Sequence, residues 1–407
     1  MRRVAVTGIG VVAPHGNDPR TLFERLVNGE SAVRRLDVRR GERCVNTVGA
    51  PAAFEPPGDW PAQKVRMLDR VSQFALAAAA RAIDDAGDPF EDRARAGVFI
   101  GTGMGGSATM DDGYHTLYAE GSDRVQPFTV LLTMSNAPAA WIGIEHRLSG
   151  PSLTYSTACS SSAVAIGEAA RRIAIGEADA MIAGGAEAPL TFGTIRAWEA
   201  LRTLAVEDAR DPGASCKPFA RNRTGLVLGE GAAIVVLEPL DRARARGVHV
   251  YGELAGYGVC TDSTHITRPS VEGQAQAMRL ALASAAIAPE SIGYVNAHGT
   301  GTLANDGVET AALHAVFGAH APRVPVSATK SMHGHLLGAA GALELVIALM
   351  AMVQGTVPPT MNLHVPDPQC DLDYVPNAAR RGIAIDAVMS SSFAFGGTNA
   401  VLVARRA

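Results

Sequence analysis

Cys159 has the setting in this sequence that best suits covalent chemistry. It lies in segment 157–162 (Thr-Ala-Cys-Ser-Ser-Ser), between a run typical of a strand and a pattern typical of a helix. Serines favour the N-cap of a helix, and the free N–H groups there favour a thiolate. We therefore interpret Cys159 as a nucleophile on a strand-to-helix turn. The other cysteines are interpreted as small packed thiols: Cys44, Cys216, Cys260 and Cys370.

Two histidines in the second half of the chain are the candidate partners of this cysteine. His298 follows the strand-like run Tyr294–Asn296 and precedes a Gly-Thr-Gly-Thr loop, so it lies where the sites of α/β proteins gather. His335 precedes a long apolar helix, whose N-terminus favours the neutral ring. Two neutral imidazoles would donate hydrogen bonds to an enolate oxygen. Each histidine alone would be interpreted as a core or loop residue, so the hypothesis depends on the combination with Cys159.

Other polar residues near these histidines are assigned more ordinary roles. Lys330 and Glu344 are expected to form a buried ion pair, because an unpaired buried charge is costly. His333 is interpreted as a core residue, and the His333-x-His335 spacing has no third ligand, so no metal site is predicted. Residues 101–106 (Gly-Thr-Gly-Met-Gly-Gly) match a dinucleotide-binding pattern, but the following residues have no clear helical pattern. We interpret this segment as a tight turn or loop.

The elements that must position these residues alternate between short apolar runs and alanine-rich helical patterns. Strands are predicted at Val4–Thr7, Val98–Ile100, Ala180–Ala183, Ala233–Leu237, Tyr294–Asn296, Val324–Ser327, Ile383–Ser390 and Ala400–Val403. Helices are predicted at Arg70–Asp85, Ser161–Ile175, Gln274–Ala286 and Leu336–Met352. This alternation predicts an α/β protein with mostly buried sheets. Residues 35–65 and 103–130 are the least periodic and are expected to be loops or insertions.

A weak internal repeat divides the chain near residue 250. In each half a strand-like run leads into a candidate site residue, Cys159 in one and His335 in the other, and then into an apolar helix. We expect two similar halves, residues 1–250 with the nucleophile and residues 251–407 with the two histidines. Their matching ends would meet at a pseudo-twofold axis.

The composition disfavours several classes of protein. Of the 407 residues, 47% are hydrophobic and 19% are charged, which is ample for a large core. The formal net charge of −4 disfavours nucleic-acid binding, which usually needs a basic excess. The longest apolar stretch, Leu336–Val353, contains Glu344 and is expected to be a buried helix, not a membrane span. Five widely spaced cysteines favour a reducing compartment, and we predict a cytoplasmic location.

Together these motifs resemble the β-ketoacyl-carrier-protein synthases, the condensing enzymes of the thiolase superfamily. The likeness extends from residues 4–10 (Val-Ala-Val-Thr-Gly-Ile-Gly) to residues 393–399 (Phe-Ala-Phe-Gly-Gly-Thr-Asn). The motifs between them are Thr-Ala-Cys159-Ser-Ser, Gly-Glu230-Gly-Ala, Asn-Ala-His298-Gly-Thr-Gly-Thr and Lys330-Ser-Met-His-Gly-His335. The set is most similar to the elongating type II enzymes, which use Cys-His-His. Starter-type synthases use Cys-His-Asn, and thiolases use a second cysteine.

The resemblance implies a thiolase-like, five-layered αβαβα fold of two pseudo-twofold-related halves, usually a homodimer. It also implies a ping-pong reaction in which Cys159 takes an acyl chain from an acyl carrier protein. His298 and His335 would then hold the thioester carbonyl of a malonyl carrier protein as carbon dioxide is lost. The resulting carbanion would attack the acyl group on Cys159. No cofactor is required, because the carrier protein presents both substrates on phosphopantetheine.

The resemblance assigns supporting roles to further residues. The backbone N–H groups of Cys159 and Phe395 would form the oxyanion hole, and Phe395 would gate access. Lys330 and Glu344 would support His335. Further family positions are matched by Thr300 and Thr302, which would contact the pantetheine arm, and by Met110 and Ile195, which would line the acyl pocket. Two departures from the family are Ala394, which replaces a glycine and would restrict the gate, and His333, which stands where threonine is common.

Several alternatives are compatible with these motifs. A non-catalytic chain-length factor would lack the nucleophile, so Cys159 and the two histidines argue against it. The chain could instead be one subunit of a heterodimeric type II polyketide or polyene synthase, or a thiolase-type coenzyme-A acyltransferase. A nucleotide-binding oxidoreductase rests on residues 101–106 alone. An acidic carrier protein would need a basic entrance, for which Lys64, Arg66 and Arg70 are candidates, with a solvated helix face as the equal alternative.

Overall fold

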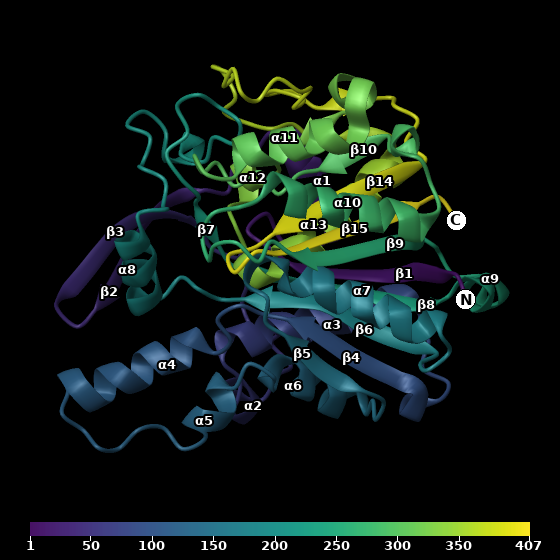
Figure 1. Ribbon diagram of the computed structural model, residues 1–407. Coiled ribbons are helices and arrows are strands. Elements are labelled where there is room, and N and C mark those ends of the chain that lie inside the picture. The colour runs from purple at the N-terminus through teal and green to yellow at the C-terminus, as the bar shows by residue number, and fades with distance from the viewer.

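A computed structural model describes residues 1–407, and its centre is a ten-stranded sheet made of two five-stranded halves (Figure 1). The first half contains β1 (Val4–Val12), β4 (Ala96–Gly101), β5 (Ser152–Tyr155), β6 (Ala180–Glu187) and β8 (Gly231–Pro239). The second contains β9 (Gly252–Thr261), β10 (Tyr294–Asn296), β11 (Val326–Ser327), β14 (Ala387–Phe393) and β15 (Thr398–Arg405). The halves are joined by a short antiparallel pairing of β1 with β9.

The two halves of the sheet have the same topology. From the outer edge to the junction, the strand orders are β5-β4-β6-β8-β1 and β11-β10-β14-β15-β9. In each half the three outer strands are parallel to one another, and the next two pairings are antiparallel. The predicted internal repeat is therefore present in the strand connectivity.

Helices complete five layers around this sheet (Figure 1). One outer layer contains α3 (Arg70–Ala86) and α6 (Ala137–His146), and the other contains α10 (Val271–Ala285) and α11 (Asp306–Phe317). The central layer is formed by α7 (Ser161–Ala174) and α13 (Ala340–Gln354), which contact each other. The expected αβαβα arrangement is confirmed.

Glycines in equivalent strands let the outer helices pack closely in both halves. A Cβ atom at Gly8 or Gly10 of β1 would lie 2.1 or 1.9 Å from a carbonyl oxygen of α3. A Cβ atom at Gly256 or Gly258 of β9 would lie 2.2 Å from a carbonyl oxygen of α10. Such distances are impossible for real side chains, so these four positions require glycine.

Helix α13 is the apolar stretch whose burial the sequence predicts. Residues Leu337–Gln354 are long and apolar enough to cross a membrane, but 89% of them are buried inside the protein. Glu344 lies in the middle of this helix and is fully buried there. The expectation of a core helix is confirmed.

Two regions that are expected to be loops contain regular structure. Residues 35–65 include the hairpin β2 (Arg34–Arg40) and β3 (Arg43–Ala50), and residues 103–130 include α4 (Ser107–Tyr114). Strand β2 has no buried residue and α4 has only one, Ser107, so neither produces an apolar periodicity. The remaining elements are α1 (Pro19–Val27), α2 (Ala62–Arg66), α5 (Thr129–Thr133), α8 (Phe192–Leu201), β7 (Leu228–Gly229), α9 (Leu240–Arg246), α12 (Lys330–His333), β12 (Thr356–Val357) and β13 (Arg380–Arg381), with short 3-10 turns and one π-helical turn, His115–Ala119.

Candidate active site

Cys159 lies on a strained turn between β5 and α7. It is the second residue of a 3-10 turn, η3 (Ala158–Ser160), and Ala158 has a φ of +49°, which is rare for alanine. The hydroxyl of Ser161 donates to the Ala158 carbonyl at 2.6 Å and accepts from the Thr157 N–H at 2.9 Å. The serines therefore hold the turn from which the thiol projects, and the expected strand-to-helix position is confirmed.

His335 lies in hydrogen-bond contact with this thiol. Its Nε2 is 3.0 Å from Cys159 Sγ, and its Nδ1 accepts from the backbone N–H of Leu337 at 3.2 Å. Because Nδ1 is an acceptor, the ring proton is on Nε2 and points toward the sulfur. Burial, reinforced by the Lys330 charge, lowers the pKa of His335 well below its usual value. The ring is therefore a neutral hydrogen-bond donor.

His298 brings a second imidazole to within 4.8 Å of the thiol. Its backbone N–H and that of Gly299 donate to the buried Glu309 carboxylate at 2.7 and 2.8 Å. Its ring makes an edge-to-face contact with the His335 ring, with centroids 5.3 Å apart. Burial, followed by the Lys330 charge, lowers the pKa of His298 well below its usual value. Both histidines are therefore neutral.

The predicted ion pair between Lys330 and Glu344 is present and fully buried. Lys330 Nζ also donates to the His298 carbonyl at 2.6 Å and lies 3.4 Å from His298 Nδ1. This leaves the His298 proton on Nε2. Lys330 therefore hydrogen-bonds to His298, whereas the resemblance implies that the pair supports His335. The reason is that the parallel strands β10 and β11 end side by side just before His298 and Lys330.

The predicted stabilisation of a Cys159 thiolate by the helix N-terminus is outweighed by burial. Cys159 is 7% exposed, and this burial raises the pKa of its thiol to about 12. The Lys330 charge and the Phe395 N–H act in the opposite direction but are weaker. In this enclosed state Cys159 is a neutral thiol at pH 7.

A pocket of about 280 Å³ leads to the three residues. Thr300, Thr302 and Phe395 line it, as the resemblance implies. Met110 and Ile195 do not line it. Met110 is exposed on α4, and Ile195 of α8 is fully buried in a small apolar cluster with Phe192 and Leu337. Packing in that cluster occupies Ile195, and the exposure of Met110 leaves it outside the enclosed pocket.

Phe395 lies in the turn between β14 and β15. Its backbone N–H lowers the pKa of the Cys159 thiol, and its ring stacks on Trp198. Positive φ angles are found at Gly396 (+87°) and Gly397 (+80°) but not at Ala394. The alanine therefore fits this conformation without strain.

Two buried carboxylates of the site escape prediction from sequence. Glu309 holds the His298 turn, and Glu187 accepts from the N–H groups of Gly103 at 2.7 Å, Met104 at 2.9 Å and Gly338 at 2.9 Å. The only sequence feature that could have pointed to Glu187 and Glu309 is an acidic residue close to a glycine-rich segment. The N–H groups of segment 101–106 thus bind the chain's own carboxylate, which leaves no phosphate cradle and argues against an oxidoreductase. Contrary to expectation, a helix, α4, does follow this segment.

The site also has the residue types of a metal centre. The candidate ligand atoms of Cys159, His298 and His335 lie within 4.8 Å of one another. However, Cys159 Sγ and His335 Nε2 are 3.0 Å apart, which is a hydrogen-bond distance, and both Nε2 atoms carry protons. Neutral N–H donors with a thiol do not form a ligand set, so the residues do not fit a metal. His333 is a core residue as predicted, with Nε2 2.9 Å from Thr329 Oγ1.

The three predicted docking cations have different environments. Lys64 pairs with Glu145 at 2.7 Å, and Arg70 pairs with Glu230 at 2.6 Å. Arg66 is exposed and has no acidic partner. Two of the three charges are therefore neutralised locally.

Known proteins with the same architecture identify the family. The family model "Beta-ketoacyl synthase, N-terminal domain" matches residues 1–243, and "Beta-ketoacyl synthase, C-terminal domain" matches residues 251–364. "Nodulation protein E" of Rhizobium leguminosarum bv. trifolii is 42% identical over 407 residues, covering 100% of this chain and 99% of the relative. "3-oxoacyl-[acyl-carrier-protein] synthase 2" of Coxiella burnetii is 42% identical over 410 residues, with the same coverage.

A solved structure has the same fold over its whole length. "The ishigamide ketosynthase/chain length factor" superimposes with a TM-score of 0.92 at 34% identity, covering 100% of this chain and 99% of that chain. The agreement of both domain models, full-length relatives and this structure leaves one conclusion. The chain belongs to the β-ketoacyl synthase family, whose enzymes condense acyl groups in fatty-acid or polyketide chain elongation.

Proposed function

We propose that Cys159 is the nucleophile of a decarboxylative condensation and that His298 and His335 stabilise its enolate. The observation that carries this proposal is the contact of Cys159 Sγ with His335 Nε2 at 3.0 Å, with a second neutral imidazole beside them. Lys330 is a positioning residue, since it holds His298 by its carbonyl and Nδ1. Glu344 neutralises Lys330 in the core.

In the first half-reaction, Cys159 Sγ attacks the carbonyl carbon of an acyl thioester on the carrier protein. The new S–C bond forms, the carrier's thiolate leaves, and it takes the proton that the cysteine loses. The N–H groups of Cys159 and Phe395 stabilise the oxyanion of the tetrahedral intermediate. The Nε2–H group of His335 donates to the sulfur while it carries negative charge.

In the second half-reaction, a malonyl thioester enters the same pocket. Its carbonyl oxygen accepts hydrogen bonds from Nε2 of His298 and His335, and the bond to its carboxylate breaks to release carbon dioxide. The enolate carbon attacks the acyl carbon on Cys159. The S–C bond then breaks, the cysteine recovers a proton from water, and a β-ketoacyl thioester leaves. The substrates arrive as phosphopantetheine thioesters on an acyl carrier protein, whose arm passes Thr300 and Thr302, and no cofactor is required.

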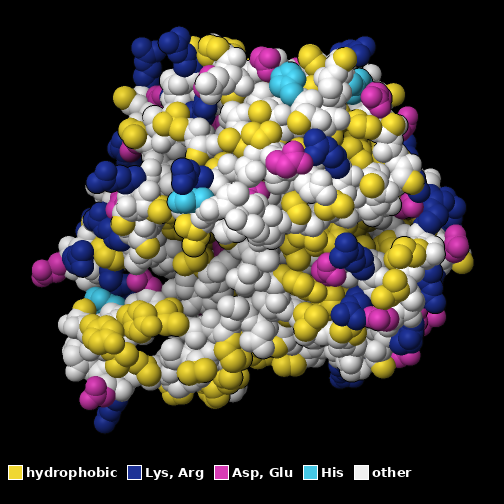
Figure 2. Space-filling model, viewed as in Figure 1, with side chains coloured by type: hydrophobic (Ala, Val, Ile, Leu, Met, Phe, Trp, Pro, Cys, Tyr) yellow, Lys and Arg dark blue, Asp and Glu magenta, His cyan; other side chains and the backbone are white.

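We infer a homodimer from an exposed apolar surface on the first half. Tyr118, Val130 and Leu131 are 81%, 71% and 51% exposed around α4 and α5, and Leu153 is exposed on the unpaired edge strand β5. Figure 2 shows hydrophobic side chains gathered where α4 lies. A second copy would cover this surface. A heterodimer with a chain-length factor is the second candidate, since the ishigamide ketosynthase is described with one.

We also infer two halves in the chain and a cytoplasmic location. The division into residues 1–250 and 251–407 is supported by the repeated strand order and by domain models that end at 243 and begin at 251. A cytoplasmic location is supported by five free cysteines without a disulfide.

The decisive experiment is to incubate the protein with an acyl carrier protein thioester and to map the adduct by mass spectrometry. We expect an acyl mass on the Cys159 peptide and none in Cys159→Ala. Cys260→Ala is the matched control, because Cys260 is a partly exposed thiol outside the pocket. An acyl adduct that persists in Cys159→Ala would contradict the proposal.

A further inference from the structure

One buried carboxyl group lies between two turns that come from opposite halves of the fold. It belongs to Glu187, the last residue of β6, which is fully buried. Its Oε2 accepts from the N–H groups of Gly103 at 2.7 Å and Gly338 at 2.9 Å, and its Oε1 accepts from the Met104 N–H at 2.9 Å. A backbone N–H group cannot accept in return, so each of these three donors needs an acceptor at this place.

The Gly338 turn also orients His335. Gly338 is the central residue of η7 (Leu337–Ala339), which lies between His335 and α13. The N–H group of Leu337 donates to Nδ1 of His335 at 3.2 Å. That bond keeps the ring proton on Nε2, which is 3.0 Å from Cys159 Sγ. The tautomer of His335 therefore depends on where this turn holds one backbone N–H group.

The backbone of this turn is strained. Leu337 has a φ of +44°, a conformation that residues with a Cβ atom rarely adopt. Strain of this kind persists only where surrounding contacts hold it. The helix that follows is fixed, because the Ala342 N–H donates to Ser162 Oγ at 2.9 Å. Relaxation of Leu337 would therefore rotate the peptide that carries its N–H group and move that group away from His335 Nδ1.

Glu187 holds the strained turn from a firm anchor in the first half of the sheet. The turn that contains Gly103 continues β4, because the Thr102 N–H donates to the Tyr155 carbonyl at 3.1 Å and extends the pairing with β5. The two turns leave no room beside the carboxyl group. A Cβ atom at Gly338 would lie 2.4 Å from the Gly103 nitrogen and 2.7 Å from Glu187 Oε2. The position of one turn is therefore transmitted to the other through this side chain.

We propose that Glu187 is a positioning residue for His335, because its bond to the Gly338 N–H keeps the Leu337 N–H against Nδ1. The inference rests on the proposed role of His335 as a hydrogen-bond donor. Without this bond the turn relaxes, and the ring also adopts the other tautomer, with the proton on Nδ1 and a lone pair on Nε2. A lone pair cannot donate to an enolate oxygen. Glu187 does not line the pocket, so it acts through His335.

The test determines the tautomer of His335 by nitrogen-15 NMR of histidine-labelled protein, with its signals identified by their absence from His335→Ala. Spectra are recorded at pH 8, because burial raises the pKa of Glu187 to about 7 and the carboxyl group is ionised above it. Glu187→Leu has a similar length and no acceptor, so an Nδ1–H signal should appear beside the Nε2–H signal of the wild type. The kcat for decarboxylation of malonyl carrier protein should fall by up to about 10²-fold, with KM unchanged because the pocket lining is intact.

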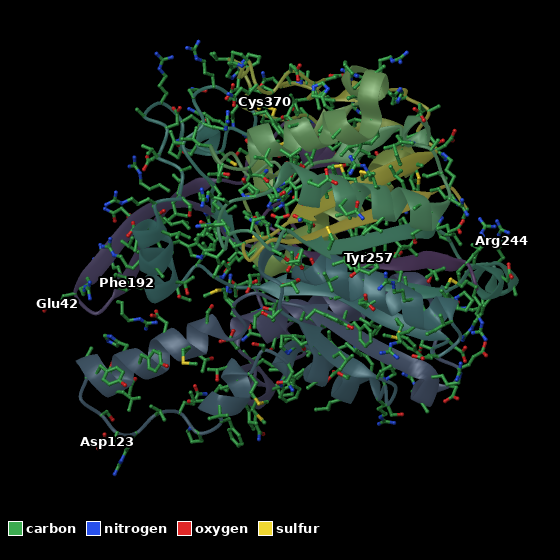
Figure 3. All side chains as sticks on the ribbon, viewed as in Figure 1. Glu42, Asp123, Phe192, Arg244, Tyr257 and Cys370 are labelled. Carbon is green, nitrogen blue, oxygen red and sulfur yellow. The ribbon has the colours of Figure 1, made fainter.

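A second substitution tests whether strain is the link. Glycine adopts a φ of +44° readily, so Leu337→Gly should leave the turn in place when its anchor is missing. The double variant Glu187→Leu/Leu337→Gly should therefore recover most of the Nε2–H signal and of kcat. Glu238→Leu is the matched control, since it removes another fully buried carboxyl group, on β8 just before α9. Figure 3 shows Arg244 of α9 at the edge of the molecule, and this control should leave the His335 signals unchanged.

The outcomes separate this inference from the proposed function. If Glu187→Leu retains the proton on Nε2 alone, the inference is overturned whatever happens to kcat. If the double variant recovers nothing, strain at Leu337 is not the link, which also overturns it. If Glu187→Leu does not fold, Glu187→Gln retains the length and one acceptor oxygen, and an unchanged tautomer in that variant would equally overturn the inference. If the wild type releases no carbon dioxide from malonyl carrier protein, the proposed function fails, and the tautomer measurement still decides the role of Glu187.

Discussion

Nε2 of His335 lies 3.0 Å from Sγ of Cys159, although the two residues are 176 positions apart and belong to opposite halves of the fold. The proton on Nε2 points toward the sulfur, because Nδ1 is already engaged by the Leu337 N–H. In this arrangement the Nε2–H group of His335 can donate to a negatively charged sulfur, and the ring cannot accept the thiol proton there.

The two histidines should be separable by half-reaction. Replacement of His298 by alanine leaves the contact between Cys159 and His335 intact, so acylation should persist. Loss of one donor to the enolate should slow malonyl decarboxylation by about 10²–10³-fold. Acylation is measured by quenching the reaction at successive times and weighing the protein by mass spectrometry. Decarboxylation is measured by the release of labelled carbon dioxide. Loss of acylation with intact decarboxylation would show that His298 has another role.

Alkylation of Cys159 should depend steeply on pH. Because burial raises the pKa of this thiol to about 12, the thiolate fraction is small at pH 7 and increases about tenfold for each pH unit up to that pKa. The rate of labelling by iodoacetamide at the Cys159 peptide should therefore rise throughout pH 7–10 without a plateau. Free glutathione in the same samples gives the profile of an ordinary thiol. A plateau for Cys159 below pH 8 would mean that the helix N-terminus outweighs burial.

Removal of one member of the buried ion pair should be more harmful than removal of both. Lys330→Met leaves the Glu344 carboxylate buried without its cation, which typically costs about 3–5 kcal/mol of unfolding free energy. In the double variant Lys330→Met/Glu344→Leu most of this loss should be recovered, as measured by thermal and urea unfolding. Decarboxylation should remain impaired, because His298 loses its contact with Lys330 Nζ. Equal stability of the single and double variants would argue against the pair as the cause.

Carrier docking should depend on exposed, unpaired cations more than on paired ones. Arg66 is exposed without an acidic partner, and the exposed Arg268 lines the pocket. Arg66→Glu and Arg268→Glu should each raise KM for a carrier-bound substrate by up to about fivefold, the size of one exposed ion pair. Reaction with a small acyl thioester should not change. Arg244→Glu on α9 is the charge-matched control, because Arg244 is not among the predicted docking cations and does not line the pocket. An equal effect on both substrates would remove the docking role.

Sequence patterns predict the site best where side chains project from buried strands. The strand Tyr294–Asn296 is observed with the predicted bounds, and the residues after it carry His298 to Cys159. Burial on both faces makes such strands continuous apolar runs, and the repeat aligns their ends. For this reason the meeting of Cys159, His298 and His335 is predictable without coordinates.

Contacts between distant backbone and side-chain atoms are not predictable in this way. Glu187 accepts from Gly338, 151 residues later, and no periodicity connects them. The direction of the Lys330 side chain toward His298 depends on the register of two short strands. The pairing of Trp198 with Phe395 likewise depends on where α8 packs. Helix α4 has little buried surface, so its sequence lacks the apolar periodicity from which helices are predicted.

The turn before α13 resembles in its geometry the Cys159 turn before α7. Gly338 is the second residue of its 3-10 turn, η7 (Leu337–Ala339), as Cys159 is of η3, and Leu337 repeats the strained backbone of Ala158 with a φ of +44°. The Gly338 N–H, the counterpart of the proposed oxyanion donor at Cys159, donates to the carboxyl group of Glu187 at 2.9 Å. The turn of the first half therefore leaves its N–H group free to donate to a transient oxyanion. The corresponding N–H group in the second half already donates to Glu187. A second nucleophile at Gly338 would therefore require removal of Glu187 as well.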